Sequence, residues 1–438
     1  MLSIENLIPA TDFLYLIIYA ILFSFLLKYV IFKNLASDQK KILLIFYYTK
    51  VFFIVLHSVM LLYVWKLADS VAVYVEAENL AKLIDNDFSN IRFLFGPSAS
   101  YTNFISLDNS LSLQTGSGME TNFFLTRVAT LLYPFALGKY LLISFGYCAI
   151  STIGVFKLYL VLNKIYPNFK RAIGLSLLFL PTLLFYSSPI YKETLCLAFL
   201  GFAASSCYNI IQKERIIINA FYLAICIFFI LLIKPYIIYA IVVAIAIAFF
   251  LTFLYRVYHK SIIGKFFTLL ITGSLIYLVG NNMSIFDPYI AEFADTSNLF
   301  QQAYNDGSST ASFEMGEIQT TFWGVVSKSP LGLYTTYFRP HLWEAKNIVV
   351  LFSAFEAFIT LLFFLYTLIK KGGHLKELLK EKFITRVILL YIIVLGVLIG
   401  LTTFNFGTLA RYKVPAIPFL WLFIFLLAGH KTKSANKA

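Results

Sequence analysis

The chain has 438 residues, of which 60% are hydrophobic, 18% aromatic and only 13% charged, and its mean hydropathy is +0.81. A soluble domain carries about 25% charged residues, so this composition excludes a water-soluble globular enzyme. Many apolar runs approach the length of about 20 residues that crosses a bilayer core as a helix. We therefore expect an all-α, polytopic transmembrane bundle in which residues 1–438 form a single domain.

The net charge of +13 raises the question of a nucleic-acid partner. The distribution of the charge argues against one, because lysine and arginine occur in short clusters between apolar runs, as the positive-inside rule describes. The four cysteines lie within apolar runs and form no CxxC pair, so we interpret them as packing residues rather than as a disulfide or metal site. The first residues lack a basic segment, so the first apolar run is expected to remain as a span.

The first two spans are predicted at residues 13–32 and 42–65, and the lysines between them place this connection in the cytoplasm and the N-terminus outside. The first outer loop follows at residues 66–122 and gathers acidic side chains. Within it, apolar residues recur at helical spacing opposite Asp69 and Glu76. This pattern indicates a short amphipathic helix on the outer membrane face.

A second surface helix is expected over residues 123–137, and nine further spans complete the bundle. Pro181 interrupts one span, and Lys234-Pro235 divides an apolar run that is too long for one span, because proline ends a helix. A second large outer loop is predicted at residues 281–346. The nine spans are expected at residues 140–162, 172–186, 194–211, 216–255 as two, 266–280, 347–369, 387–403 and 414–428.

The eleven predicted spans place the C-terminus in the cytoplasm. Basic residues are then concentrated in the cytoplasmic connections and acidic residues in the outer loops, a bias that the opposite orientation would reverse. The span at 266–280 is short unless its helix starts near Ile262. On the cytoplasmic side, leucines alternate with Lys376, Lys380 and Lys382, which is typical of an interfacial helix bound to anionic lipid.

Asp69 is the first candidate for chemistry. Its simplest role is that of a helix N-cap, since an aspartate before a helix accepts a hydrogen bond from a free backbone N–H. Alternatively, it is a catalytic carboxylate just outside the membrane, because a general base is needed to take a proton from an incoming hydroxyl. One side chain can have both roles, and the residues alone leave the choice open.

Two short motifs resemble those of the GT-C superfamily of membrane glycosyltransferases. Residues 69–74 (DSVAVY), with Ala77 after them, resemble the D-x-x-x-x-Y-x-x-A opening of the first outer loop in that family. Residues 411–415 (RYKVP) resemble the R-Y-x-x-P entry to a late span. Residues 185–195 and 337–356 are similar to segments of uncharacterised bacterial membrane proteins encoded among surface-polysaccharide genes.

The resemblance implies that Asp69 is the catalytic base and that Tyr74 belongs to the substrate site. It also implies a polyprenyl-phosphate sugar as donor, a glycan acceptor, and a place in the bacterial inner membrane. The chain departs from the family in its extra span before the acidic loop and in Ser70, where those enzymes often have a second acidic residue. No metal site is predicted, because His341 has no cysteine or second histidine near it.

Two further pairs of polar residues precede predicted spans. Lys192 and Glu193 follow Pro189 and form either an ordinary outer turn with snorkelling ends or a site in which Lys192 binds the donor phosphate and Glu193 orients it. Arg339 suits bidentate binding of phosphate, and Trp343 offers a flat face to a sugar ring. The alternative for this second pair is an aromatic-belt anchor with one positive end.

Glu356 lies about two to three helical turns inside a predicted span. A carboxylate in hydrocarbon costs several kcal/mol and normally faces a partner or a wet cavity. Two interpretations of Glu356 stay open. It forms an internal ion pair, for which Lys50 and Lys157 are basic residues in other apolar runs, or it lines the substrate cavity. Arg411 lies at an outer membrane edge, where it binds lipid phosphate or snorkels.

The first hypothesis is a glycosyltransferase in which Asp69 takes the proton of the acceptor while Arg411 and Arg339 stabilise the departing phosphate. An O-antigen-type polymerase or ligase relies mainly on arginines, so it predicts that the two arginines matter and Asp69 does not. A flippase or transporter of lipid-linked glycans requires polar residues near mid-membrane in several spans. An ATP-driven pump is disfavoured, because the sequence has no P-loop.

Overall fold

The computed structural model describes residues 7–65, 69–96, 104, 120–282, 287–306 and 311–430. Across these residues the regular secondary structure is helical apart from one isolated bridge between Ser312 and Asn405. The predicted all-α class is therefore confirmed. Parts of both predicted outer loops, residues 66–122 and 281–346, lie outside the described residues. The chain divides into two compact units, Met1–Pro235 and Tyr236–Ala438.

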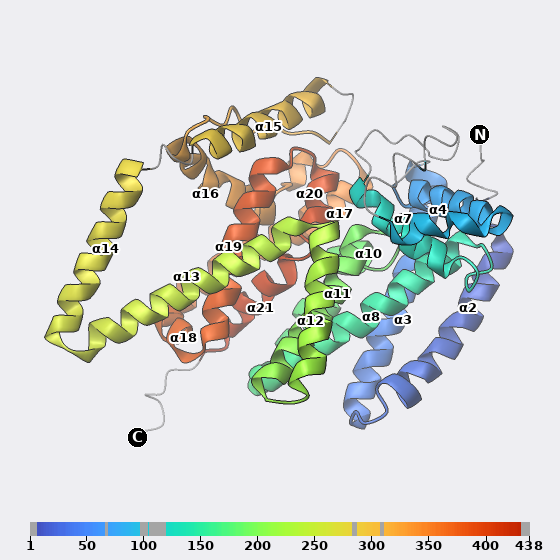
Figure 1. Ribbon diagram of the computed structural model, residues 1–438, viewed down its shortest axis with the longest axis horizontal. Helices are drawn as coiled ribbons and strands as arrows, with labels where there is room; N and C mark the ends of the chain where they lie inside the picture. Colours follow the sequence, from blue (N-terminus) through green and yellow to red (C-terminus); the bar gives the residue numbers. More distant parts are fainter. Residues whose placement is uncertain are drawn as a thin grey trace. The chain divides into compact units, whose positions relative to one another are not determined.

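The first unit is built around α8 (Tyr140–Ile165), most of whose side chains are buried. Two long apolar helices pack against it, α2 (Ala10–Phe25) and α3 (Ser37–Met60), and each continues through a π-helical turn. α11 (Lys192–Ile211) packs along α8 and along α12 (Ile216–Ile233), as Figure 1 shows. These five helices account for five of the predicted spans.

Two facing glycines allow α8 and α11 to approach closely. A Cβ added to Gly201 would lie 1.9 Å from the carbonyl oxygen of Gly154, and one added to Gly154 would lie 2.3 Å from that of Ala198. Because these neighbours are backbone atoms, no rotation of a side chain could make room. Small residues at a crossing are what permits membrane helices to pack backbone to backbone.

The predicted span at residues 172–186 is broken in the structure. α9 (Lys170–Leu178) ends three residues before α10 (Pro181–Tyr186), and Pro181 is the first residue of the second helix, as its position predicted. The connection from α10 to α11 is enclosed by protein, since Ser187, Ser188 and Tyr191 are buried. The turn is therefore enclosed by other helices, and its position on the outer side stays a prediction.

The predicted amphipathic helix of the first outer loop exists as α4 (Asp69–Asn86), but it does not lie on a surface with one face exposed. Residues 70–77 are all buried, Glu76 included. The reason is that α7 (Glu120–Leu132) packs against α4 and covers the side that the sequence pattern left polar. The surface character predicted for the start of this helix is wrong, because a neighbouring helix encloses it.

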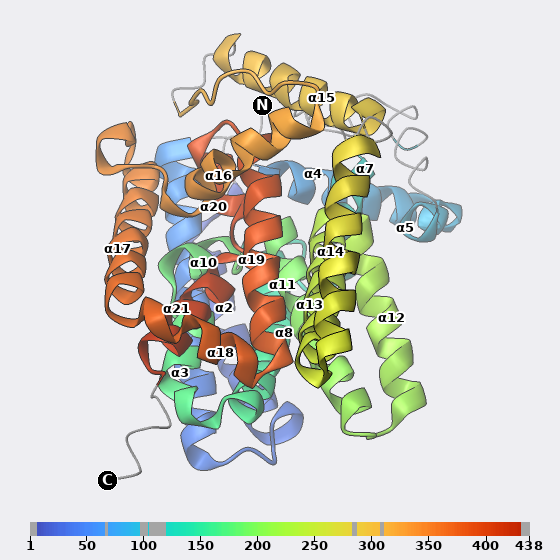
Figure 2. The ribbon, with the colours of Figure 1, turned by 90° about the vertical axis from the view of Figure 1, so that its left-hand side faces the viewer.

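The second unit begins with α13 (Pro235–Lys260), so the break at Lys234-Pro235 is confirmed. α14 (Ile262–Asn282) starts at Ile262, the position that a full-length span requires. α15 (Asp287–Asp306) follows. α16 (Phe322–Phe338) then crosses α19 (Phe383–Thr402) (Figure 2), and a Cβ on Gly400 would lie 2.0 Å from the Gly332 carbonyl oxygen.

α17 (Ile348–Lys371) packs against α20 (Phe406–Tyr412) and α21 (Ile417–Ala428), and α18 (Leu375–Glu381) packs on α19 and α21. Eight described helices are long and apolar enough to cross a membrane, and a ninth span results if α20 and α21, bent by 65°, count as one. The chain is therefore a polytopic helical membrane protein. The other two predicted spans correspond to α9 with α10 and to α14, which are not among these helices. The eight are α2, α3, α8, α11, α12, α13, α17 and α19.

Candidate functional site

Asp69 is the first residue of α4, directly after the long helix α3 and its π-helical turn. Its side chain is exposed, whereas the residues that follow it, 70–77, are buried. A carboxylate in the first turn of a helix is favoured by the unpaired N–H groups there. The position thus combines an exposed carboxylate with a favourable electrostatic setting, which both predicted roles of Asp69 require.

Tyr74 anchors α4 to the corner that precedes α8. Its hydroxyl donates to the Gly138 carbonyl oxygen at 2.8 Å, and its ring lies edge-on to Tyr140, whose hydroxyl donates to Ser70 at 3.0 Å. Burial raises the pKa of Tyr74, so its phenol stays protonated and remains a donor. These contacts give Tyr74 a structural role. Its predicted role toward substrate stays a prediction.

Glu76 is a buried carboxylate that sequence analysis placed on an exposed face. Thr126 of α7 donates its hydroxyl hydrogen to a Glu76 carboxylate oxygen at 2.9 Å. A buried charge needs such partners, and here they come from a helix about 50 residues further along the chain. The only sign of this burial in the sequence was the presence of hydroxyl residues in α7. Hydroxyl residues are too common in helices to have identified Glu76 as buried.

Glu193 and Lys234 form a buried ion pair, with 1% and 3% of their side chains exposed. The pair joins the first turn of α11 to the residue between α12 and α13. Lys234 is thus buried, although it lies at the turn between α12 and α13. Lys192, the neighbour of Glu193, is half-buried at the first position of α11. The carboxylate of Glu193 compensates the charge of Lys234. The buried charge of Glu193 is therefore explained without a role in orienting Lys192.

Two polar residues of α3 point at the buried turn before α11. The Lys50 ammonium donates to Ser151 Oγ and to the Ser187 carbonyl oxygen, both at 2.6 Å. His57 Nε2 lies 2.9 Å from the Tyr191 hydroxyl. Lys50 and His57 are two turns apart on one face of α3, so together they hold the turn in place. The sequence indicated Lys50 only as a possible ion-pair partner, and it carried no signal for His57.

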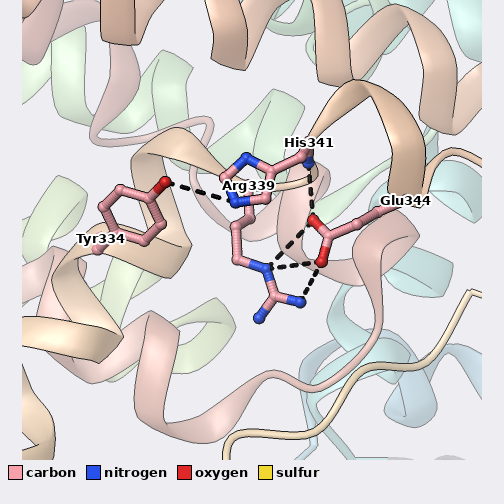
Figure 3. Close-up of polar contacts among 4 residues, drawn as sticks. All are labelled: Tyr334, Arg339, His341 and Glu344. Carbon is pink, nitrogen blue, oxygen red and sulfur yellow. Dashed lines mark hydrogen bonds and ion pairs between the residues drawn. The ribbon is translucent and has the colours of Figure 1, made fainter.

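In the second unit, Arg339 is held by Glu344 (Figure 3). Arg339 Nε donates to both carboxylate oxygens, at 3.1 and 3.2 Å, and a terminal guanidinium nitrogen also pairs with Oε1. The same carboxylate accepts the backbone N–H of His341 at 2.7 Å. Burial by itself raises the pKa of Glu344, but the hydrogen bonds from Arg339 and His341 outweigh it and hold the pKa below its ordinary value.

Two phenyl rings complete the surroundings of Arg339. The guanidinium carbon lies 4.5 Å from the centre of the Phe313 ring and 5.3 Å from that of Phe406, and these rings stack on each other. The backbone of Phe313 donates to the carbonyl oxygen of Phe404 at 3.0 Å. Arg339 therefore fastens the segment before α16 to the start of α20. A guanidinium whose charge a carboxylate already neutralises is a poor ligand for phosphate.

Trp343 is strongly exposed, with 82% of the residue accessible to solvent. Its ring stacks on His341, with centroids 4.7 Å apart, and His341 Nε2 lies 3.4 Å from the Tyr334 hydroxyl (Figure 3). An exposed indole suits either a sugar platform or an interface anchor. Among the residues that the structure describes, no group of three or more His, Cys, Asp or Glu side chains could hold a metal ion.

Glu356 is buried on α17 and interacts electrostatically with Lys413, which is fully buried at the bend between α20 and α21. Lys50 and Lys157 were the predicted basic partners in apolar runs. Lys413 was not predicted, because it lies in the RYKVP stretch assigned to the membrane edge. Arg411 is half-buried in the last turn of α20, with its guanidinium 5.7 Å from the Tyr412 ring.

The structure thus groups the predicted residues within each unit. Asp69 and Tyr74 lie on α4 of the first unit, where Lys192 and Glu193 begin α11. In the second unit Arg339 and Trp343 precede α17, and Glu356 and Arg411 belong to packed helices. Comparison with known proteins finds no match to a protein family, to a curated protein or to a solved structure.

Proposed function

We propose that this protein is a membrane glycosyltransferase of GT-C type. It moves a sugar from a polyprenyl-(pyro)phosphate carrier to an acceptor on the outer face of the bacterial inner membrane, in the synthesis of surface polysaccharide or glycoconjugate. The observation that carries the proposal is the exposed carboxylate of Asp69 at the start of α4, directly beyond an apolar helix long enough to span. The likeness of residues 69–74 and 411–415 to GT-C motifs supports it.

In the proposed reaction, the Asp69 carboxylate accepts the proton of the acceptor hydroxyl. The acceptor oxygen forms a bond to the anomeric carbon of the sugar, and the bond from that carbon to the carrier phosphate breaks. The phosphate leaves with the negative charge. Lys192, half-buried at the start of α11 in the same unit as Asp69, is the basic residue proposed to stabilise it. The proposal does not give Arg339 this role, because Glu344 and two phenyl rings already contact its guanidinium.

The proposal includes the topology of eleven spans, with the N-terminus outside and the C-terminus in the cytoplasm. In this topology α4 lies on the outer side, where a lipid-linked sugar would meet it. The broken segment of α9 and α10 and the helix α14 supply the two spans beyond the nine counted by length and composition. The clusters of lysine and arginine between the apolar runs support this orientation.

Transfer of a labelled sugar from a polyprenyl-linked donor, measured in proteoliposomes, tests the role of Asp69. We expect Asp69→Asn to lower the rate by about 100-fold or more, since a general base contributes roughly 10²–10⁴-fold. Asp87→Asn, a change of an exposed aspartate beyond the end of the same helix, serves as the matched control and should keep the wild-type rate. A wild-type rate for Asp69→Asn would remove Asp69 from the mechanism.

The same assay separates the glycosyltransferase from the polymerase or ligase. A polymerase or ligase, which relies mainly on arginines, predicts that Arg411→Gln slows transfer and that Asp69→Asn stays active. The proposed glycosyltransferase predicts that Asp69→Asn loses activity.

A second candidate function is a flippase or transporter of lipid-linked glycans. The observation that favours it is the set of buried ionisable side chains in the apolar helices and at their ends. Such side chains often mark pathways for polar solutes, and they are more numerous here than the sequence indicated. Movement of a lipid-linked glycan between leaflets, with the glycosyl bond intact, would favour this function over transfer. The buried side chains include Asp12, Lys50, His57, Glu193, Lys234, Glu356 and Lys413.

A further inference from the structure

The second unit contains a line of buried polar groups where α17 packs against α20 and α21. On α17 they fall within about 60° of one another, because successive residues of a helix are about 100° apart. The opposite face of α17 is apolar and exposed, with Leu362 51% exposed. We call the line the α17–α21 seam. It comprises Ser353, Glu356, Thr360 and Thr367 of α17 together with Lys413 and Trp421.

Contacts across the seam set its register. Lys413 interacts electrostatically with Glu356, and the Trp421 ring stacks on Phe363 with centroids 5.7 Å apart. The two helices therefore run side by side in the same direction. Fourteen residues separate Ser353 from Thr367, which corresponds to about 21 Å along α17. The seam thus extends over most of a hydrocarbon layer of about 30 Å.

Several atoms on the seam are buried and form no hydrogen bond with any described residue. They are Ser353 Oγ, Thr367 Oγ1, Lys413 Nζ and Trp421 Nε1. By contrast, the Thr360 hydroxyl donates to the Glu356 carbonyl oxygen at 2.6 Å. Each buried polar group without a partner costs about 1–3 kcal/mol, and native proteins leave few of them. Four such atoms along one helix contact indicate a ligand that accepts hydrogen bonds at several positions along the helix axis.

We propose that the α17–α21 seam is a hydrated path that gives water, and with it the proton, access to Glu356 and Lys413 inside the second unit. Water fits better than an anion, because the Glu356 carboxylate compensates the Lys413 ammonium and leaves no net charge to attract one. The polar atoms are also spread over about 21 Å, which suits a file of waters with two to four partners each. The inference does not depend on the proposed function.

Cysteine accessibility in native membranes tests the path. The four native cysteines all belong to the first unit, so they can be replaced by alanine before Ser353→Cys and Thr367→Cys are introduced one at a time. The probe is a membrane-impermeant, positively charged methanethiosulfonate, which reacts with the thiolate that forms in water. Leu362→Cys, on the exposed apolar face of α17, is the matched control, and Lys346→Cys gives the rate of an exposed thiol.

We expect both seam cysteines to react at least tenfold faster than Leu362→Cys. A rate at either seam position no faster than that of Leu362→Cys shows a dry contact and overturns the proposal. Gel filtration in detergent checks that each variant is folded, and Thr360→Cys replaces any variant that is not. The readout needs no catalytic activity, so the failure of the proposed glycosyltransferase would leave this result unchanged.

Discussion

At the scale of the residue, several buried charged side chains of this protein are bound by partners far along the chain. Glu193 pairs with Lys234, Asp12 with Lys139 at 2.5 Å, and Glu76 is bound by a threonine. Burying an unpaired charge costs free energy. Each of these contacts therefore links the position of one helix to that of its partner. These charges are therefore structural as well as candidates for chemistry.

Removing one member of the Glu193–Lys234 pair should destabilise the protein strongly. We expect Lys234→Met or Glu193→Gln to cost about 3–5 kcal/mol, because each leaves the other group buried without its partner. The double variant should lose much less than the sum of the two single losses. Thermal unfolding in detergent, followed for all four proteins, measures this coupling. Strictly additive losses would show that the two side chains act independently.

The Arg339–Glu344 contact predicts a dependence on pH. Because the pKa of Glu344 lies below its ordinary value of 4.5, the contact stabilises the folded state fully above about pH 4.5 and less as the pH falls toward the lower folded pKa. We expect Glu344→Gln to lower the thermal midpoint at pH 7 and to lack this acid-sensitive part of the wild-type profile. Midpoints measured between pH 7 and pH 3 check this.

Glu381→Gln is the control for that experiment, since Glu381 is exposed on α18. Its profile should follow that of the wild type. A Glu344→Gln profile with the same decrease in acid as the wild type would show that other carboxylates cause the decrease.

At the scale of the element, each unit contains one crossing where two helices meet glycine to glycine. Gly154 and Gly201 join α8 and α11, and Gly332 and Gly400 join α16 and α19. In both cases the atom that a Cβ would meet belongs to the backbone. The crossing distance is therefore set by the absence of a side chain, because a larger residue could be accepted only by separating the helices.

This geometry predicts opposite effects for two similar substitutions. Gly201→Ala should lower the thermal midpoint markedly, because the new Cβ would lie 1.9 Å from the Gly154 carbonyl oxygen. Gly273→Ala, at a helical position with nothing within 4 Å, should leave it unchanged or raise it, since a helical glycine costs about 0.5–1 kcal/mol relative to alanine. Equal midpoints for both variants would contradict the close crossing.

At the scale of the whole molecule, the proposed orientation rests on the distribution of basic residues. Alkaline phosphatase is active only outside the cytoplasm, and green fluorescent protein fluoresces inside it. We expect a phosphatase fusion after Gly96 to be active and one after Lys213 to be inactive, with the reverse pattern for fluorescent fusions. The opposite pattern at both sites would reverse the topology and place Asp69 in the cytoplasm.

The helices and their breaks could be predicted from the sequence because their causes are local. Apolar runs of span length must form helices in a bilayer, where each backbone group needs a partner within its own segment. Proline ends a helix wherever it lies, so Pro181 and Pro235 identified two helix starts. The helix start at Ile262 followed from the length that a span requires. The number of spans beyond nine stays a prediction.

The tertiary structure decided which polar side chains are buried and with what partners. Glu76 lies on the polar face of its own helix, yet it is buried because α7 covers that face. Lys413 and Lys234 looked like boundary lysines, yet both are enclosed by neighbouring helices. The pattern within one helix specifies where its apolar face lies, but whether another helix covers the remaining faces depends on contacts between residues far apart in the chain.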